Sequence, residues 1–250
     1  MTLNRFKSGT PEPGDPIISS GSPHIPKVKP KLVPLQKPLL VMDNDREGVN
    51  SDKFWHTLGL VFKPRLTKTM MRLDKFGDLP IESLIRMQIR GLIIDVDGTL
   101  TEHHNQEFKP EVIAKLHEVR ENFKACFFSN NADVRPELLR TGIPFVHNVP
   151  AKPDPIGFEL AARLKLGLEP YQCAMVGDNF ITDGGCRKAG MPFIHVKPIP
   201  GPESFGHRLT RSYGIAVANL HDWRREKKAQ AKIAQEAKEA AAKKALGGKD

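Results

Sequence analysis

The chain has 250 residues, 39% of them apolar and 13 of them phenylalanine, which is enough to bury a core. Its formal net charge is +9, and its three cysteines show no CxxC spacing, so a disulfide framework or a zinc site is disfavoured and a reducing compartment is expected. Residues 1–20 lack the apolar core of a signal peptide, and every apolar run is shorter than the roughly 18 residues of a membrane span. We therefore expect a soluble, cytoplasmic protein.

Composition divides the chain into three regions. Eight of the 21 prolines lie between Pro11 and Pro38, so we expect a disordered or extended tail over residues 1–50, with a docking arm as the alternative. Residues 51–222 are expected to form the globular domain. Residues 223–250 are predicted to form a helical tail, whose nine basic and four acidic residues give it a charge of +5. This tail is either a solvated helix or an element that binds nucleic acid or an anionic lipid surface.

Residues 51–90 have a mixed helical pattern, from which we expect two or three short helices before the first strand. They include an apolar cluster from Phe54 to Phe62 and a further group that begins at Met70. Core packing or a hydrophobic lid is the simpler interpretation of these side chains, and contact with membrane or substrate is the alternative.

The stretch from Gly91 to Leu100 is the strongest local signal. An apolar run without polar alternation, typical of a strand buried on both faces, leads directly into Asp95, Asp97 and a Gly-Thr turn. Because strand side chains repeat every two residues, both carboxylates leave the strand on the same side. Two neighbouring carboxylates repel each other and need a cation or a shared proton. A metal or acid/base site is therefore favoured over a solvated turn.

Helices and strands alternate regularly after this turn, which predicts an α/β fold with a doubly wound parallel sheet. In such sheets, ligands bind outside the carboxyl ends of the strands. The expected helices are Pro110–Asn122, Asp133–Thr141, Ile156–Leu166 and Thr182–Ala189, and the expected strands are Ala125–Phe128, Ile143–His147, Cys173–Val176 and Pro192–Val196.

Polar residues follow the predicted strands at the points where these strands end. Ser129 follows the second strand, Lys152 precedes a helix, and Asp178 and Asp183 follow a later strand. Each residue alone is a weak signal, since a serine here usually caps a helix and a lone lysine is usually solvated. Together with the aspartate pair, in this order and on this topology, they predict one catalytic site.

The strings DVDGTL and GDNFITD, with SNN and AKPDP between them, resemble the motifs of the haloacid dehalogenase (HAD) superfamily of phosphohydrolases. The resemblance covers Arg90–Val196. Within this superfamily, the motifs are similar to those of subfamily IIIA, in particular of YqeG-type proteins and phosphatidylglycerophosphate phosphatases. The resemblance implies a HAD-like fold and a Mg2+-dependent phosphoric monoester hydrolase.

The resemblance also implies catalytic roles. Asp95 would be the nucleophile that forms an aspartyl phosphate, and Asp97 would act as general acid and then as general base. Ser129 and Lys152 would bind the phosphate. Of the Asn130-Asn131 pair, one side chain would cap a helix and the other would face the phosphate, and we assign the substrate contact to Asn130.

A set of metal ligands follows from the same resemblance. Asp95, Asp178 and the backbone carbonyl of Asp97 would bind Mg2+, and Asp183 would support the ion without touching it. Independently, Mg2+ is a hard cation that prefers oxygen ligands. A dianionic phosphate approaches a group of carboxylates only where cations intervene.

The motif spacing leaves no room for a cap domain, because only Thr101–Lys109 separates the nucleophile turn from the next helix. An uncovered site suits a bulky substrate, such as a phospholipid headgroup, a phosphoprotein or a nucleic-acid end. The basic tail and the apolar cluster favour a phosphatidylglycerophosphate-like lipid and a peripheral contact with an anionic membrane. His103 and His104 are interpreted as part of an exposed polar loop, with substrate contact as the alternative.

Two other functions stay open on the sequence alone. The first alternative is a phosphatase for small sugar or nucleotide phosphates. The second is a HAD-like binding module that docks on nucleic acid or the ribosome through its basic tails. The complete catalytic set favours an enzyme, for which nucleic acid is not required.

Overall fold

The computed structural model describes residues 57, 59–103, 105, 107–131 and 135–246, and for residues 240–246 only the backbone. The tail expected over residues 1–50 lies outside this part of the chain. So do Phe54, Trp55 and Leu58 of the predicted apolar cluster.

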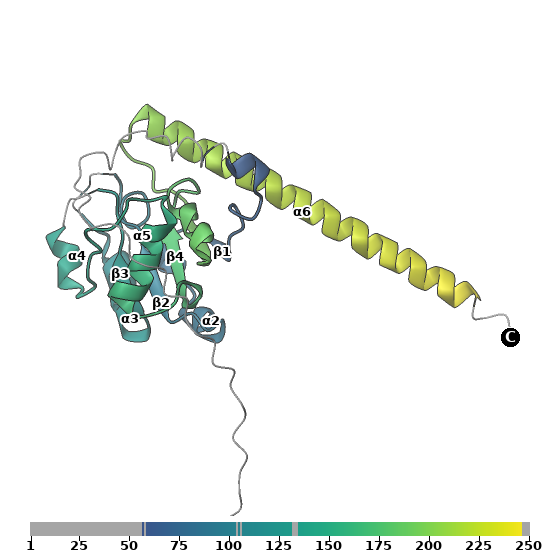
Figure 1. The fold of residues 1–250 in the computed structure, drawn as a ribbon, viewed down its shortest axis with the longest axis horizontal. Coiled ribbons are helices and arrows are strands. Elements are labelled where there is room, and N and C mark those ends of the chain that lie inside the picture. The colour runs from purple at the N-terminus through teal and green to yellow at the C-terminus, as the bar shows by residue number, and fades with distance from the viewer. Residues whose placement is uncertain (1–56, 58, 104, 106, 132–134, 247–250) are drawn as a thin grey trace, which may run out of the picture. The chain divides into compact units, whose positions relative to one another are not determined.

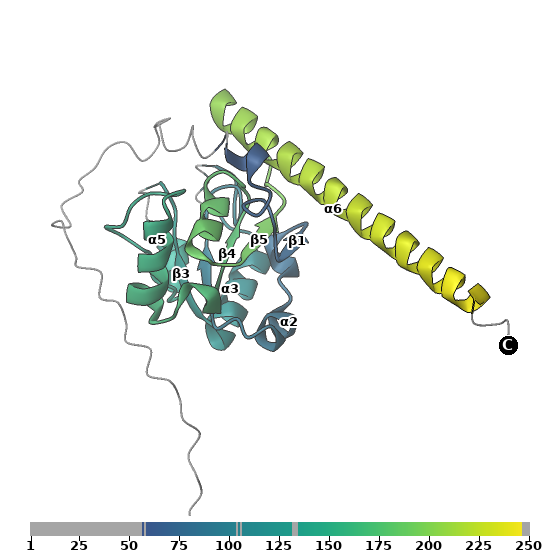
Figure 2. The same ribbon diagram turned by 45° about the vertical axis from the view of Figure 1, so that its right-hand side comes forward.

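Five strands form one parallel sheet in the order β1-β5-β4-β2-β3 (Figure 1). Figure 2 shows β3 toward one edge of this sheet and β1 toward the other. The strand β2 lies between β3 and β4, with Ile94 opposite both Phe127 and Val176. The strands are β1 (Met71–Leu73), β2 (Gly91–Ile94), β3 (Lys124–Phe127), β4 (Cys173–Gly177) and β5 (Phe193–Val196).

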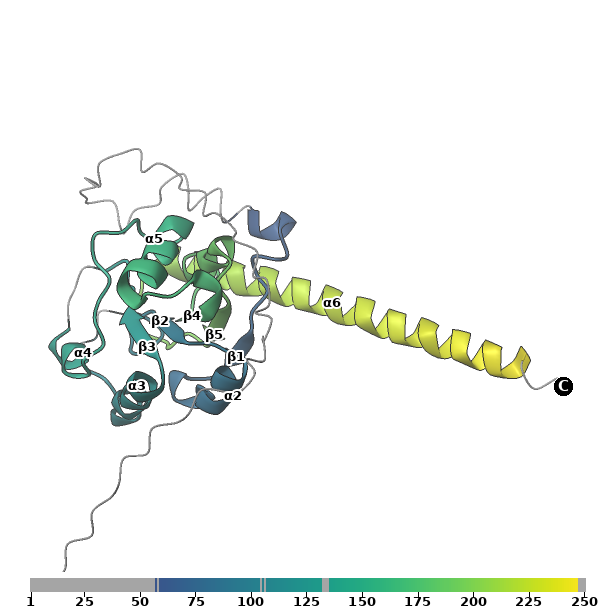
Figure 3. The ribbon, with the colours of Figure 1, turned by 60° about the horizontal axis from the view of Figure 1, so that its bottom comes forward.

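Helices cover both faces of the sheet, as Figure 3 shows for α5 on one side of the strands and α2 and α3 on the other. This arrangement confirms the predicted doubly wound α/β fold. No cap domain interrupts the described residues between the strands. The α-helices are α2 (Ile81–Arg86), α3 (Pro110–Asn122), α4 (Pro136–Arg140), α5 (Pro155–Leu160) and α6 (Phe205–Leu246), and the short 3-10 and π elements are Phe76–Asp78, Ala161–Leu166, Pro170–Gln172 and Asp183–Ala189.

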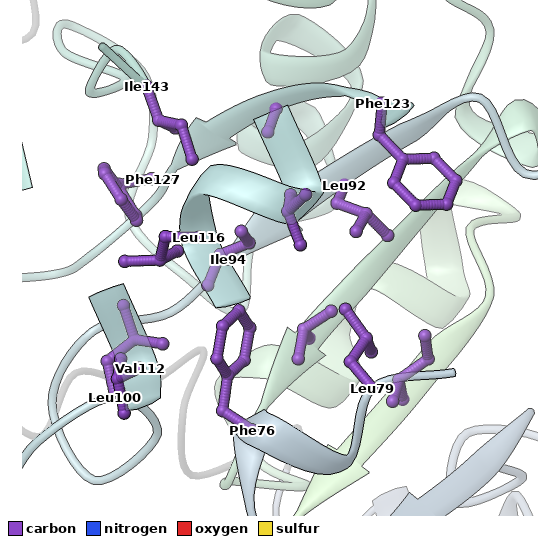
Figure 4. Packing of buried hydrophobic residues seen from close by; sticks show 14 of the residues in the cluster. Phe76, Leu79, Leu92, Ile94, Leu100, Val112, Leu116, Phe123, Phe127 and Ile143 are labelled. Atoms are coloured by element: carbon purple, nitrogen blue, oxygen red, sulfur yellow. The ribbon is translucent and has the colours of Figure 1, made fainter. Parts of the chain in front are cut away.

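The sheet separates two hydrophobic cores, and β2 contributes to both. Leu92 and Ile94 belong to the cluster drawn in Figure 4, whereas Ile93 between them packs with Met175 and Phe158 on the other face. All four residues of β2 are buried. The apolar run before Asp95 therefore has the burial on two faces that its lack of alternation predicts.

Several predicted elements differ from the structure. The helix expected over Thr182–Ala189 is a 3-10 helix over Asp183–Ala189. Met71–Leu73, within the expected helical segment, is instead the edge strand β1, which pairs with β5. The helix expected from Asp133 begins at Pro136, because Arg135 is extended, as is usual for a residue before proline. The strand expected over Ile143–His147 is reduced to a single bridge between Phe145 and Phe127.

The helix α6 begins at Phe205, well before the tail predicted from residue 223, and continues through that boundary. Contacts of Arg72 and His221 help to hold its first half against the domain. Arg72 donates hydrogen bonds of 2.6 Å to both Asn219 and Asp222, and the His221 ring lies 3.0 Å from the Leu60 carbonyl oxygen. The described side chains from residue 226 to 239 are exposed, as expected of a solvated helix. None of the helices in the described ranges is long and apolar enough to cross a membrane.

Candidate active site

The site lies where the direction of strand addition reverses. From β2 the chain proceeds outward to β3 and then returns to form β4 on the other side of β2. Asp95 follows β2 directly and Asp178 follows β4 directly, so both carboxylates occupy this switch point. Asp183 joins them, and the three side chains place one oxygen each within 4.8 Å of one another.

Lys152 neutralises part of this acidic cluster. Its Nζ donates hydrogen bonds of 2.6 Å to Asp95 Oδ1 and of 2.6 Å to Asp183 Oδ1, and its side chain is 2% exposed. The Asn130 side chain positions Lys152 by accepting from its backbone N–H at 2.9 Å and donating to its carbonyl at 3.0 Å. These two bonds use the amide of Asn130, and the substrate contact expected for Asn130 stays a prediction.

The carboxylate of Asp183 is engaged at both oxygens. Its Oδ1 accepts from Lys152, and its Oδ2 accepts from the backbone N–H of Asn179 at 3.0 Å. By contrast, among the described residues Asp95 accepts from Lys152 through Oδ1, and Asp178 accepts from Arg211 through Oδ2. The roles expected from the motifs, Asp95 and Asp178 as metal ligands and Asp183 as their support, stay predictions.

Burial and mutual repulsion make the carboxylates of the cluster weak acids. Burial, followed by repulsion from Asp183, raises the pKa of Asp95 to about 7, although Lys152 opposes this change. Burial and then Asp95 raise the pKa of Asp178 to about 7, and burial also raises the pKa of Asp183. For Lys152, burial would lower the pKa, but Asp183 and Asp95 outweigh it, so the amine stays charged.

Asp97 forms an ion pair with a different cation, Arg135. The Arg135 side chain is 1% exposed, and its guanidinium lies 5.8 Å from the centre of the Phe108 ring. Among the described residues, Arg135 Nε and Nη1 have no hydrogen-bond partner. Sequence reasoning missed Arg135, because no motif marks it. The nearby Ser129 accepts a hydrogen bond of 3.0 Å from the backbone N–H of Asn131.

A second cation reaches the cluster from α6, which no sequence motif indicated. Arg211 Nη1 donates a hydrogen bond of 2.8 Å to Asp178 Oδ2, and Arg211 Nη2 donates to Glu203. The turn after Asp97 makes room for this contact, since Gly98 has a φ of +80° and a Cβ there would lie 2.6 Å from Asp178 Oδ2.

His103 also lies beside this ion pair. Its Nε2 is 3.4 Å from Arg211 Nη1 and 3.7 Å from Glu203 Oε2, and its side chain is only 17% exposed. The interpretation of His103 as an exposed loop residue is therefore wrong, because the first turns of α6 cover it. His104 lies outside the described residues.

The cluster has the properties of a Mg2+ site. It offers only carboxylate oxygens, which are the ligands that this hard cation prefers. Asp95 and Asp178 each keep one oxygen outside the hydrogen bonds to Lys152 and Arg211. The repulsion that raises the carboxyl pKa values would also be relieved by a divalent cation.

An aspartate cluster with a buried lysine, at the switch point of a parallel sheet, is the arrangement expected of a HAD-like phosphatase. The chain belongs to the family described as mitochondrial PGP phosphatase, whose model matches residues 54–186, more than half of the chain.

Two curated proteins are similar to about half of this chain. Probable phosphatase YqeG of Bacillus subtilis is 33% identical over 135 residues, which cover 52% of this chain and 77% of that protein. The mitochondrial phosphatidylglycerophosphatase GEP4 of Saccharomyces cerevisiae is 28% identical over 142 residues, which cover 51% and 76%. Both relatives support the family assignment and the resemblance found in the motifs.

Among solved structures, a HAD family enzyme from Bacteroides thetaiotaomicron, in complex with magnesium and inorganic phosphate, matches at 14% sequence identity. The match covers 48% of this chain and 98% of that one, with a TM-score of 0.34. A score this low supports no conclusion about the site.

Proposed function

We propose that this phosphatase hydrolyses phosphomonoesters through an aspartyl phosphate on Asp95, with Mg2+ as cofactor. The observation that carries the proposal is the position of Lys152, whose Nζ lies 2.6 Å from both Asp95 and Asp183 within the buried cluster. An ammonium group in this position balances two carboxylates and offers positive charge to an incoming phosphate. A purely structural aspartate cluster would have no need for such a costly arrangement of buried charges.

In the first displacement, an Asp95 carboxylate oxygen attacks the phosphorus atom, and the bond from phosphorus to the leaving oxygen breaks. Asp97 donates a proton to that leaving oxygen, so the alcohol departs neutral. Arg135 contacts the Asp97 carboxyl group and orients it for this transfer. Lys152 stabilises the negative charge on the transferred phosphoryl group.

In the second displacement, Asp97 accepts a proton from water, and the water oxygen attacks the phosphorus atom. The bond between phosphorus and the Asp95 oxygen breaks, which regenerates the carboxylate and releases inorganic phosphate. When bound by Asp95, Asp178 and the Asp97 carbonyl, Mg2+ supplies positive charge that reduces the repulsion between nucleophile and substrate. Ser129 and the backbone N–H groups near it are the proposed donors to the phosphate oxygens.

Mg2+ affinity should fall as the pH falls below about 7, because the metal binds only ionised carboxylates. The pKa values of Asp95 and Asp178 are both about 7 without metal, so protons compete with Mg2+ below that pH. We expect a dissociation constant at pH 6 that is roughly 10- to 100-fold higher than at pH 8. Calorimetric titration at the two pH values measures it. Asp178→Asn should weaken binding at both, and an affinity independent of pH would contradict this prediction.

The proposed substrate is a bulky phosphate, in particular the headgroup of a phosphatidylglycerophosphate-like lipid. Two observations support this choice: the site has no cap domain within the described residues, and a relative of the same family is named a phosphatidylglycerophosphatase. A bulky substrate can close an open site with its own surface. Small sugar or nucleotide phosphates lack that surface.

A peripheral contact with an anionic membrane is part of this proposal. One face of α6 exposes Phe205, Leu209, Leu220 and Trp223, which at 100° per residue fall within one narrow stripe. Lys227 lies 4.4 Å from the centre of the Trp223 ring and adds positive charge to that face. Such a helix suits the boundary between headgroups and acyl chains. The cytoplasmic location expected from the sequence stays a prediction.

The test compares substrates for the wild-type chain with Mg2+. We expect kcat/KM for phosphatidylglycerophosphate in anionic vesicles to exceed that for a small sugar phosphate at least about tenfold, since remote contacts contribute to the transition state. A preference for the small ester would contradict the lipid as substrate, but it would not contradict the proposed hydrolysis through Asp95. Steeply salt-dependent binding of nucleic acid without any turnover would favour a binding module instead.

A further inference from the structure

The ion pair between Arg211 and Glu203 is buried, although a contact that only anchors α6 to the domain could be exposed. Both side chains are less than a tenth exposed, at 9% and 5%. Other residues already hold α6 against the domain further along the helix: Arg72 on β1 donates to Asn219 and Asp222, and His221 on α6 lies against the Leu60 carbonyl oxygen. Burying a further pair of charges is costly, so Arg211 calls for another explanation.

The position of Arg211 links it to the reacting groups. It donates to Asp178, a proposed metal ligand, and it lies over the turn that follows Asp97. A Cβ on Gly98 would lie 3.2 Å from Arg211 Nη1. A guanidinium presents several N–H groups in one plane and matches the oxygens of a phosphate better than an ammonium does.

The formal charges of the site give Arg211 a definite role. Three aspartates and Glu203 contribute four negative charges, and Lys152 and Arg211 contribute two positive ones, which leaves a net charge of −2. The pair of Asp97 and Arg135 adds nothing to this sum. One Mg2+ brings the site to neutrality, which lowers the repulsion that an incoming phosphate dianion meets. Without Arg211, the metal-loaded site would stay at −1.

We propose that Arg211, supplied by α6 and paired with Glu203, is an anion-binding residue of the active site that acts beside Lys152. The inference rests on the proposed function, because it assumes that phosphate enters at the aspartate cluster. It assigns to the first half of α6, outside the sequence motifs, a direct part in binding the phosphate group of the substrate.

The test measures cation and anion binding separately, by calorimetry on the full chain at pH 8. Arg211→Gln should raise the dissociation constant of inorganic phosphate, with Mg2+ present, roughly 10- to 100-fold, because hydrogen bonds to a charged group are lost. The same variant should bind Mg2+ as tightly as the wild type or more tightly. Glu203→Gln should do the opposite, weakening Mg2+ binding roughly tenfold while leaving phosphate binding undiminished.

Two further variants separate direct contact from charge and from structure. The double variant Arg211→Gln/Glu203→Gln has the wild-type net charge, so its Mg2+ affinity should return toward the wild type while phosphate binding stays weak. Arg72→Gln removes contacts that hold α6 but lies on β1, and it should change neither affinity. An Arg72 variant that reproduces the Arg211 effect would overturn the inference.

Other outcomes decide between the inference and the function on which it rests. If Arg211→Gln loses Mg2+ and phosphate binding together, or if its phosphate binding is unchanged, the proposed role of Arg211 is wrong. Neither outcome would contradict the proposed phosphatase reaction. Turnover of the wild-type chain is measured in the same series. Wild-type phosphate binding that depends on Arg211, without hydrolysis of any ester, would support the inference and overturn the proposed reaction.

Discussion

Asp95→Asn should reduce turnover at least about a thousandfold, because an amide oxygen cannot replace the carboxylate that attacks phosphorus. The fold should survive the change. The Asp95 carboxyl is buried next to Asp183, and its pKa of about 7 shows that its charge is costly at neutral pH. Replacing it with a neutral side chain of the same shape should therefore leave the free energy of unfolding at pH 8 equal or higher.

The measurement is hydrolysis of p-nitrophenyl phosphate and of phosphatidylglycerophosphate, each with and without Mg2+. Urea unfolding of the same samples checks the fold. Asp74→Asn, an exposed aspartate on the surface, is the matched control and should keep full activity. Mass spectrometry must exclude deamidation of the new asparagine. If the folded Asp95→Asn variant hydrolyses these esters as fast as the wild type, the covalent mechanism is wrong.

Lys152→Met should cost both activity and stability. Turnover should fall roughly 100- to 1,000-fold, since a charge that stabilises the transferred phosphoryl group is removed. Stability should fall by about 3–5 kcal/mol at pH 8, because Asp95 and Asp183 are left buried without their shared cation. The exposed Lys165, replaced by Met in the same way, provides the control and should change neither quantity.

The stability loss in Lys152→Met should depend on pH in a definite direction. Without the ammonium, the folded-state pKa values of Asp95 and Asp183 rise further above the unfolded value of about 4. Carboxyls with raised pKa values favour the folded state at low pH, and that contribution is lost as the pH rises through the folded value. The variant should therefore lose less stability at pH 5 than at pH 8, as urea unfolding at the two pH values would measure. Equal losses would contradict the role of Lys152 as the counter-ion.

The core of the fold was predictable because its signals are local. A few neighbouring residues are enough to predict each of three features: the buried strand before Asp95, the helix Pro110–Asn122 and the end of a helix at the glycine after Leu166. Strand and helix alternation then limits the topology, because parallel strands need crossover helices and these are right-handed. The meeting of Asp95 with Asp178 follows from that topology, since both come directly after neighbouring parallel strands.

The edge strand β1 and the two arginines of the site, Arg135 and Arg211, were not predictable in this way. β1 has only three residues, Met-Arg-Leu, and its strand conformation is set by pairing with β5 more than a hundred residues later. Arg135 and Arg211 carry no motif, and Arg211 lies in the part of α6 that precedes the predicted tail. Propensity gives no information about a contact between Asp178 and a side chain 33 residues further on.

By itself, the sequence determined that this chain forms a doubly wound parallel sheet with aspartates and a lysine at the strand ends. The reason is that periodicity and turn chemistry act over short distances, and the motif spacing identifies the phosphatase family. Only the tertiary structure decided which cations meet which carboxylates: Lys152 bridges Asp95 and Asp183, Arg135 pairs with Asp97, and Arg211 pairs with Asp178. These choices depend on which helix covers the switch point, because charge pairing inside a protein is set by packing.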